Sequence, residues 1–76
     1  MNKDIFKAII DEIEHDYDMT DVDGTYIYEV VFVTTSETFV TTIDCVFQKE
    51  TYVVLRTEDY IRFVPYENVM EIDVPL

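Results

Sequence analysis

The chain has 76 residues, 49% of them apolar, with seventeen acidic and five basic side chains and a formal net charge of −12 at pH 7. This composition predicts one domain, 1–76, because the chain is too short for two hydrophobic cores and too apolar to stay unfolded. The negative charge repels phosphate groups and so argues against direct binding to nucleic acid or to an anionic membrane.

The single cysteine, Cys45, excludes an internal disulfide and indicates a reducing compartment. The first thirteen residues mix charged with apolar side chains, unlike the central run of a signal peptide. The longest apolar run, residues 30–33, is far too short to cross a bilayer. We therefore expect a cytoplasmic protein.

The apolar residues near the N-terminus recur at the spacing of one helix face: Ile5, Phe6, Ile9, Ile10 and Ile13. This pattern predicts an amphipathic helix over about residues 3–14, with Asn2 as its N-cap. Residues 16–24 have a turn-forming composition without a repeating apolar face, so we expect a loop there.

Beyond Gly24 the apolar period becomes two, which is the period of β-strands. The pattern predicts five strands, over residues 25–35, 37–47, 51–56, 60–64 and 69–74. In the second of them, the face predicted to point to the core consists of Phe39, Thr41, Ile43, Cys45 and Phe47. Pro65 has no N–H for a central ladder, so residues 65–68 are expected to form a short break.

One helix followed by five strands with short connections predicts an α+β fold. We expect the N-terminal helix to precede a strongly bent, five-stranded antiparallel sheet. The eleven aromatic residues, six Tyr and five Phe, suit a small sheet that closes partly into a barrel.

The stretch from residue 44 to residue 72, DCVFQKETYVVLRTEDYIRFVPYENVMEI, resembles the second half of the Sm-like small β-barrels. In that family a leucine closes the third strand and an Asn-Val pair begins the fifth, and Leu55, Asn68 and Val69 stand at these places. The resemblance extends over residues 25–74 and implies an Sm-like or SH3-like small barrel.

The chain departs from the Sm-like family at its nucleic-acid site. Tyr52 stands in place of the family's RNA-binding asparagine, and Pro65 and Tyr66 replace its Arg-Gly pair, so the resemblance does not extend to uridine binding. It still implies ring assembly through the edges of the fourth and fifth strands. The side chains expected along these edges are Ile61, Phe63, Met70 and Ile72.

Seven acids, which we call the acidic block, occur within thirteen residues that contain no lysine or arginine: Asp11, Glu12, Glu14, Asp16, Asp18, Asp21 and Asp23. One interpretation is a solvated surface that keeps a small protein soluble, and adaptation to high salt is a related one. A second is a calcium loop. If Gly24 is its turn glycine, however, two of the ligand positions fall on Met19 and Val30, whose side chains have no oxygen to bind calcium. A third is recognition of a basic protein surface by an array that imitates a polyanion.

The sequence offers little for catalysis. Ser36 is the only serine and His15 the only histidine, so no set of nucleophile, base and orienting residue is evident. Cys45 alternates in step with the predicted core face, which favours an inert buried thiol. A single glycine excludes a glycine-rich phosphate loop. We expect a non-enzymatic protein with no catalytic residues, cofactor or metal.

Tyr52, Tyr60 and Tyr66 fall on or beside the less apolar faces of their segments, so they are candidate contacts with a partner; the alternative is packing in the core. Together these features predict a small acidic protein that blocks a basic, nucleic-acid-binding protein surface. Inhibitors of host defence or DNA-binding proteins carried by phages and mobile elements are similar in size and charge. The alternative is an Sm-like homo-oligomeric ring that acts as a scaffold or holds a small ligand.

Overall fold

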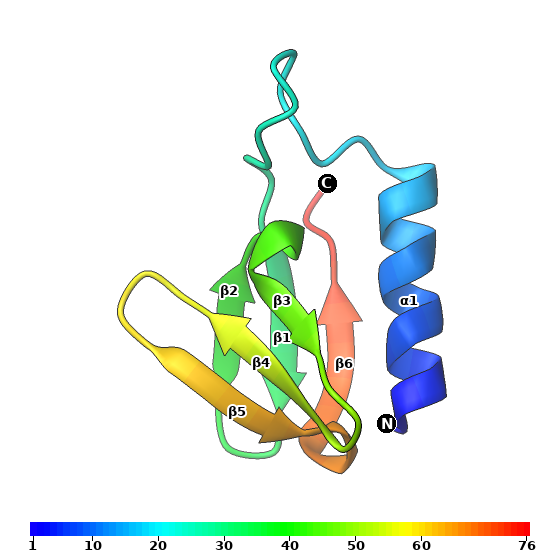
Figure 1. Ribbon diagram of the computed structural model, residues 1–76, viewed down its shortest axis with the longest axis vertical. Helices are drawn as coiled ribbons and strands as arrows, with labels where there is room; N and C mark the ends of the chain where they lie inside the picture. The colour runs from blue at the N-terminus through cyan, green and yellow to red at the C-terminus, as the bar shows by residue number, and fades with distance from the viewer.

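The computed structural model describes residues 1–76 (Figure 1). One helix, α1 (Lys3–Asp16), precedes six strands. The strands are β1 (Val30–Thr34), β2 (Thr38–Thr41), β3 (Val46–Gln48), β4 (Tyr52–Arg56), β5 (Ile61–Pro65) and β6 (Val69–Asp73). Two short 3-10 turns, η1 (Ile43–Cys45) and η2 (Tyr66–Asn68), precede β3 and β6.

Helix α1 forms where its periodicity predicts it. The side chain of Asn2 caps the N-terminus, because its Oδ1 accepts the N–H of Ile5 at 2.8 Å. Phe6, Ile10 and Ile13 point inward and are buried, whereas Ile5 is about half exposed. The predicted helix and its cap are therefore confirmed, with the C-terminus two residues later than expected.

The first predicted strand begins five residues later than expected, at Val30 instead of residue 25. The preceding residues form a turn in which the N–H of Asp21 donates to the carbonyl of Thr25 at 2.9 Å, and Gly24 takes a positive φ of 83°. Tyr26 pairs with Thr20 only as an isolated bridge. The hydrogen bonds of this turn use backbone groups that a longer strand would have needed.

The predicted five-stranded bent sheet is wrong, although the α+β class is correct. The strands form two separate three-stranded antiparallel sheets, in the orders β2-β1-β6 and β3-β4-β5. In the first sheet β1 lies at the centre, with Phe32 opposite Phe39 of β2 and Ile72 of β6. In the second, β4 lies at the centre, with Val54 opposite Phe47 and Phe63.

The two sheets arise because the predicted strand 37–47 is interrupted by η1. The Cys45 N–H donates to the Thr42 carbonyl at 3.0 Å, and the Thr42 hydroxyl donates to the Asp44 carboxylate at 2.5 Å. These local bonds compete with a continuous ladder. The turn also changes the phase of the side chains, so Phe47, predicted to face the core, is 42% exposed.

One hydrophobic core lies between the two sheets and α1. Its largest fully buried side chains come from the helix and from strands of both sheets: Phe6, Phe32, Leu55, Val30, Val53 and Val69. Thr41 joins the sheets directly, because its hydroxyl donates to the carbonyl of Arg56 at 2.5 Å. The core therefore holds both sheets and the helix as one body.

The break predicted at residues 65–68 is present over residues 66–68, as η2, whereas Pro65 is the last residue of β5 and lies opposite Tyr52. Both β5 and β6 lie at the edge of their sheets. In Figure 1, α1 runs alongside β6, and the 17–29 loop lies at the upper end of the molecule. α1, the only α-helix, is neither long nor apolar enough to span a bilayer.

Candidate interaction surfaces

The acidic block lies at the upper end of the molecule in Figure 1, on the C-terminal half of α1 and the loop after it. Six of its seven side chains are exposed, and Asp21 is half-buried. On α1, Asp11 and Glu14 are three residues apart and Glu12 and Asp16 four apart, so the two pairs lie on different flanks of the exposed side. The helical acids therefore spread over that side instead of forming a single row.

Basic side chains neutralise little of this charge. Lys7 pairs with Asp11 at 2.8 Å, and His15 Nδ1 lies 2.7 Å from Asp16. The hydrogen bond to Asp11 and its negative charge raise the pKa of Lys7. Elsewhere, Lys3 pairs with Glu50 and Arg62 with Glu37. Four of the seventeen acids thus have a basic partner, which leaves thirteen without one.

Two acids of the loop serve its local structure. Asp18 accepts the N–H of Thr20 at 3.2 Å, and Asp21 accepts the N–H groups of Asp23 and Thr25 at 2.9 and 3.0 Å. These bonds hold the loop in one conformation, as Asx-type turns do. No three His, Cys, Asp or Glu side chains come together in an arrangement that could hold a metal ion.

A hollow of about 310 Å³ lies where α1 meets the loop. Its walls combine acids with aromatic side chains: Glu14, His15, Asp16, Tyr17, Asp18, Met19, Thr20 and Tyr26. The structure thus brings three acids of the block, Glu14, Asp16 and Asp18, around one concave surface.

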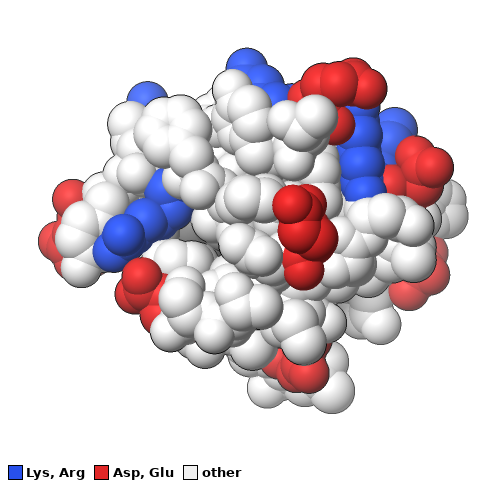
Figure 2. All heavy atoms as spheres, turned by 90° about the horizontal axis from the view of Figure 1, so that it is seen from below, with Lys and Arg blue, Asp and Glu red and all other residues white.

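At the lower end of the molecule the charge is distributed differently. Figure 2 shows that most of this surface is uncharged, with acidic side chains in separate groups and basic side chains beside several of them. The acids do not form one continuous layer over this face. Any continuous acidic surface is therefore restricted to other parts of the molecule, and the acidic block at the upper end is its best candidate.

The second sheet carries an exposed apolar surface. Alternation and register place seven side chains on its outer side. Six of them form what we call the apolar face: Phe47, Tyr52, Val54, Ile61, Phe63 and Pro65. The seventh is the exposed Arg56, which lies opposite Ile61. Phe63 is 68% exposed and Ile61 50%. The Tyr52 and Phe63 rings lie 6.2 Å apart and border a hollow of about 350 Å³ with Glu67.

The three tyrosines expected to contact a partner have different environments. Tyr52 lies on the apolar face and Tyr60 is 53% exposed, so both are accessible. Tyr66 is buried, which contradicts its expected role. Its ring packs edge-on against Phe6, its hydroxyl donates to the carbonyl of Lys49 at 2.7 Å, and burial raises its pKa.

The four residues expected at oligomer edges do lie on edge strands, Ile61 and Phe63 on β5 and Met70 and Ile72 on β6. Met70 is 62% exposed, but Ile72 is partly buried and packs against the core. Three of the four side chains are therefore available to another chain.

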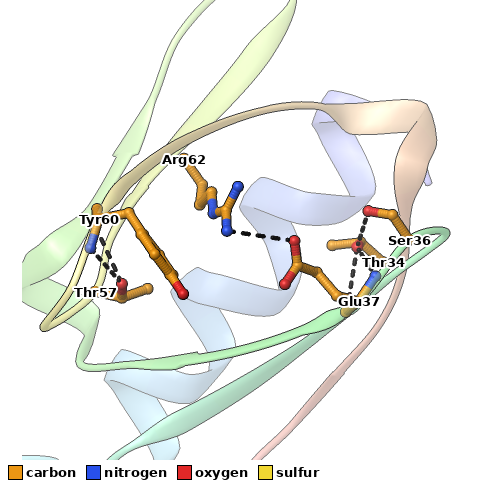
Figure 3. A network of polar contacts seen from close by, with 6 residues as sticks. All are labelled: Thr34, Ser36, Glu37, Thr57, Tyr60 and Arg62. Atoms are coloured by element: carbon orange, nitrogen blue, oxygen red, sulfur yellow. Dashed lines mark hydrogen bonds and ion pairs between the residues drawn. The ribbon is translucent and has the colours of Figure 1, made fainter.

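Arg62 links the two sheets, a role that its strand pattern did not reveal. Its guanidinium lies 4.1 Å from the Tyr60 ring centre and 5.4 Å from that of Phe39 on β2. Figure 3 shows it directed from β5 toward Glu37 in the β1–β2 turn, to which it pairs at 3.5 Å. The turn itself is held by Thr34, whose hydroxyl accepts the Glu37 N–H at 3.1 Å. These contacts hold β5 against the first sheet.

The residues considered for catalysis lie in separate places. His15 is exposed on α1, Ser36 lies in the β1–β2 turn, and Cys45 ends η1. Cys45, predicted to be buried, is partly buried, and its Sγ lies 3.6 Å from the Thr42 hydroxyl oxygen.

The pair of acids Glu71 and Asp73 makes the free energy of unfolding depend on pH. Glu71 and Asp73 are exposed on the same face of β6. The pKa of Glu71 is raised, first by a hydrogen bond shared with Asp73 and second by repulsion from its charge. An acid whose pKa is raised on folding contributes stability that is present below its unfolded pKa and lost as the pH rises through the folded pKa.

We therefore expect Glu71→Gln to raise the melting temperature at pH 7, where it removes this repulsion, and to raise it less near pH 4, because the raised pKa of Glu71 favours its neutral form as the pH falls. Thermal melts followed by circular dichroism at both pH values measure the difference. Glu67→Gln, the same change on η2, serves as a control with a smaller gain at pH 7. An equal gain from Glu71→Gln at both pH values would contradict the prediction.

Comparison of the chain with protein-family models, with curated proteins and with solved structures finds no match. The resemblance to Sm-like proteins therefore stays a prediction. The acidic block and the apolar face are what point to the function of this protein.

Proposed function

We propose that this protein is a non-enzymatic, cytoplasmic binding protein whose acidic block covers a basic, nucleic-acid-binding surface of another protein. The observation that carries the proposal is the exposure of six of the seven acids of the block on one end of a folded body. Thirteen acids of the chain have no basic partner within it, so their charges are not neutralised before a basic target binds.

The physical basis is competition with nucleic acid. Duplex DNA carries one negative charge per roughly 1.7 Å of its axis, and a protein that binds it aligns lysines and arginines with that row. The helix and the hydrogen-bonded loop fix the backbone that carries these carboxylates, so binding costs the conformational freedom of their side chains but not that of the chain. A field of one sign also raises the rate of encounter with a basic target.

The proposal predicts complexes with basic proteins that weaken steeply with salt. The tagged chain is used to capture proteins from a cytoplasmic extract at 50 mM and 500 mM NaCl, and each captured protein is tested for competition with DNA or RNA. We expect basic partners whose affinity falls at least tenfold at the higher salt. Partners that are not basic, or binding that is unchanged in 500 mM salt, would overturn the proposal.

Two variants of equal net charge locate the binding surface. Neutralising Glu12, Glu14 and Asp16 as Gln, Gln and Asn should weaken capture about tenfold, by roughly 0.5 kcal/mol for each lost charge contact. Neutralising Glu58, Asp59 and Glu67 in the same way, on the β4–β5 turn and η2 away from the block, should leave capture by the acidic block largely intact. Equal losses would show that net charge alone is responsible.

The size and charge of the chain suit an inhibitor carried by a phage or mobile element, directed against a host defence or DNA-binding protein. This setting is part of the proposal and is tested by the genomic neighbourhood. Neighbouring genes of housekeeping metabolism would speak against it.

A homo-oligomeric ring, acting as a scaffold or small-ligand holder, is the second candidate. It is favoured by the two edge strands, β5 and β6, which expose Ile61, Phe63 and Met70. The charge of −12 on each copy opposes it. Size-exclusion chromatography with light scattering distinguishes the two, because a monomer removes the ring and a hexamer or heptamer supports it.

A further inference from the structure

The free edge of β5 exposes backbone hydrogen-bonding groups. At the β4–β5 turn, the N–H of Thr57 donates to the carbonyl of Tyr60 at 2.8 Å, so these two residues form a hydrogen-bonded pair. Hydrogen-bonded and non-hydrogen-bonded pairs alternate along an antiparallel ladder. The next pair, Arg56 and Ile61, is therefore not hydrogen-bonded, and the one after it, Leu55 of β4 and Arg62, is. The N–H and C=O groups of Ile61 then point away from β4, toward the free edge, and the same is true of Phe63.

The same two residues carry the most exposed side chains of the apolar face. Ile61 and Phe63 point to the outer side of the sheet, where Phe63 lies next to Tyr52. A strand placed beside β5 would therefore find backbone partners and apolar side chains at the same positions. This combination is what proteins use when they bind an extended peptide by strand addition.

The β5 edge is also held in place before any partner arrives. The Arg62 side chain, between the rings of Tyr60 and Phe39, fastens the strand to the first sheet, and the Thr57 hydroxyl accepts the Tyr60 N–H at 3.1 Å (Figure 3). A strand that is already ordered costs less conformational entropy on binding.

Charge selects the kind of partner. Glu58 and Asp59 precede β5 and Glu67 follows it, all three are exposed, and none has a basic partner. The exposed Arg56 lies opposite Ile61, so these three acids outnumber the one cation on this surface. A second copy of this chain would offer β6, whose exposed Glu71 and Asp73 would lie near these acids. A segment with lysine or arginine at its two ends would instead form ion pairs with them.

We propose that the β5 edge and the apolar face bind an extended segment of another protein, with apolar side chains at alternate positions and basic residues at both ends. The segment adds as a fourth strand beside β5 and completes the order β3-β4-β5. This surface is separate from the acidic block, which lies at the upper end of Figure 1, and the proposal does not depend on the function of that block.

The experiment uses two synthetic peptides of identical composition. One has two lysines at each end and valine alternating with threonine between them; the other has the same termini with the valines grouped. Binding to the full chain is measured by calorimetry in 150 mM NaCl, and backbone amide exchange by NMR. We expect the alternating peptide to bind at least tenfold more tightly and to protect the amides of Ile61 and Phe63.

Substitutions identify the surface. Phe63→Ser should weaken the alternating peptide about tenfold, whereas Met70→Ser, which changes a similarly exposed residue of β6, should not. Ile61→Pro removes one donor of the free edge and should also weaken binding, and a melting curve confirms that each variant is folded.

Three results would overturn the proposal. The two peptides could bind equally, which would indicate attraction by charge alone. The Phe63→Ser variant could bind like the parent chain, which would exclude the apolar face. Light scattering could show a dimer in which the β5 amides are protected without peptide, which would identify a second copy as the occupant.

Discussion

Replacing Phe6 by alanine should remove about 3–5 kcal/mol from the free energy of unfolding, the range for large aromatic residues in well-packed cores. Phe6 is fully buried, its ring stacks on Phe32 at 6.1 Å between centres, and it meets Tyr66 edge-on at 5.3 Å. It is the side chain through which α1 contacts both β1 and η2. A domain of this length has roughly 4–11 kcal/mol in total, so Phe6→Ala should leave it close to unfolding.

Urea titration followed by circular dichroism measures this loss. Ile5→Ala is the matched control, because Ile5 is the neighbouring helix residue but is half exposed. We expect it to cost less than about 1 kcal/mol, since little apolar area is lost. If Phe6→Ala also lowered the free energy of unfolding by less than about 1 kcal/mol, α1 would not be docked on the sheets.

Neutralising Glu12, Glu14 and Asp16 should stabilise the protein by about 1–2 kcal/mol at low salt, which is a rise of roughly 5 °C or more in melting temperature. Glu14 and Asp16 lie in the last turn of α1, where the partial negative charge of the helix end repels them. Each also lies within a chain of net charge −12. Both repulsions disappear when the charges are removed.

Melting curves in 10 mM and 500 mM NaCl test this expectation. Salt should raise the melting temperature of the parent chain, because it screens exposed like charges, and should affect the neutralised variant less. Asp4→Asn is a useful control, since Asp4 lies in the first turn, where a negative charge is favourable. A neutralised variant that is less stable than the parent would show that these acids make stabilising contacts.

A gain in stability on neutralising these three acids would also bear on function. Side chains that lower the stability of a fold are expected at sites where the activity of the protein requires them. If the neutralised variant is more stable and also loses the basic partner, both outcomes have the same cause, which is a concentration of carboxylates at one end of α1.

Parts of the two surfaces follow from strand alternation. Once Val53 and Leu55 are assigned to the core, Tyr52 and Val54 must face outward, and antiparallel register then brings Phe63 beside Val54. The partnership of Arg62 with Glu37, Phe39 and Tyr60 could not be derived in this way, because it joins residues of different sheets.

The sequence by itself determined the features that depend on neighbouring residues. The period of 3.6 and the Asn2 cap specify α1, and the alternation around Val53 and Leu55 specifies β4, because helix caps and strand faces are set within a few residues. The number and charge of the acids are equally a property of the chain alone.

The tertiary structure decided where these elements meet. The alternation in residues 37–47 is compatible with one long strand, but the hydrogen bonds of Thr42 and the packing of two sheets around one core divide it at η1. Tyr66 looks accessible in a polar segment and is buried because α1 places Phe6 against its ring. Burial depends on contacts between residues far apart in the chain, and local periodicity carries no information about them.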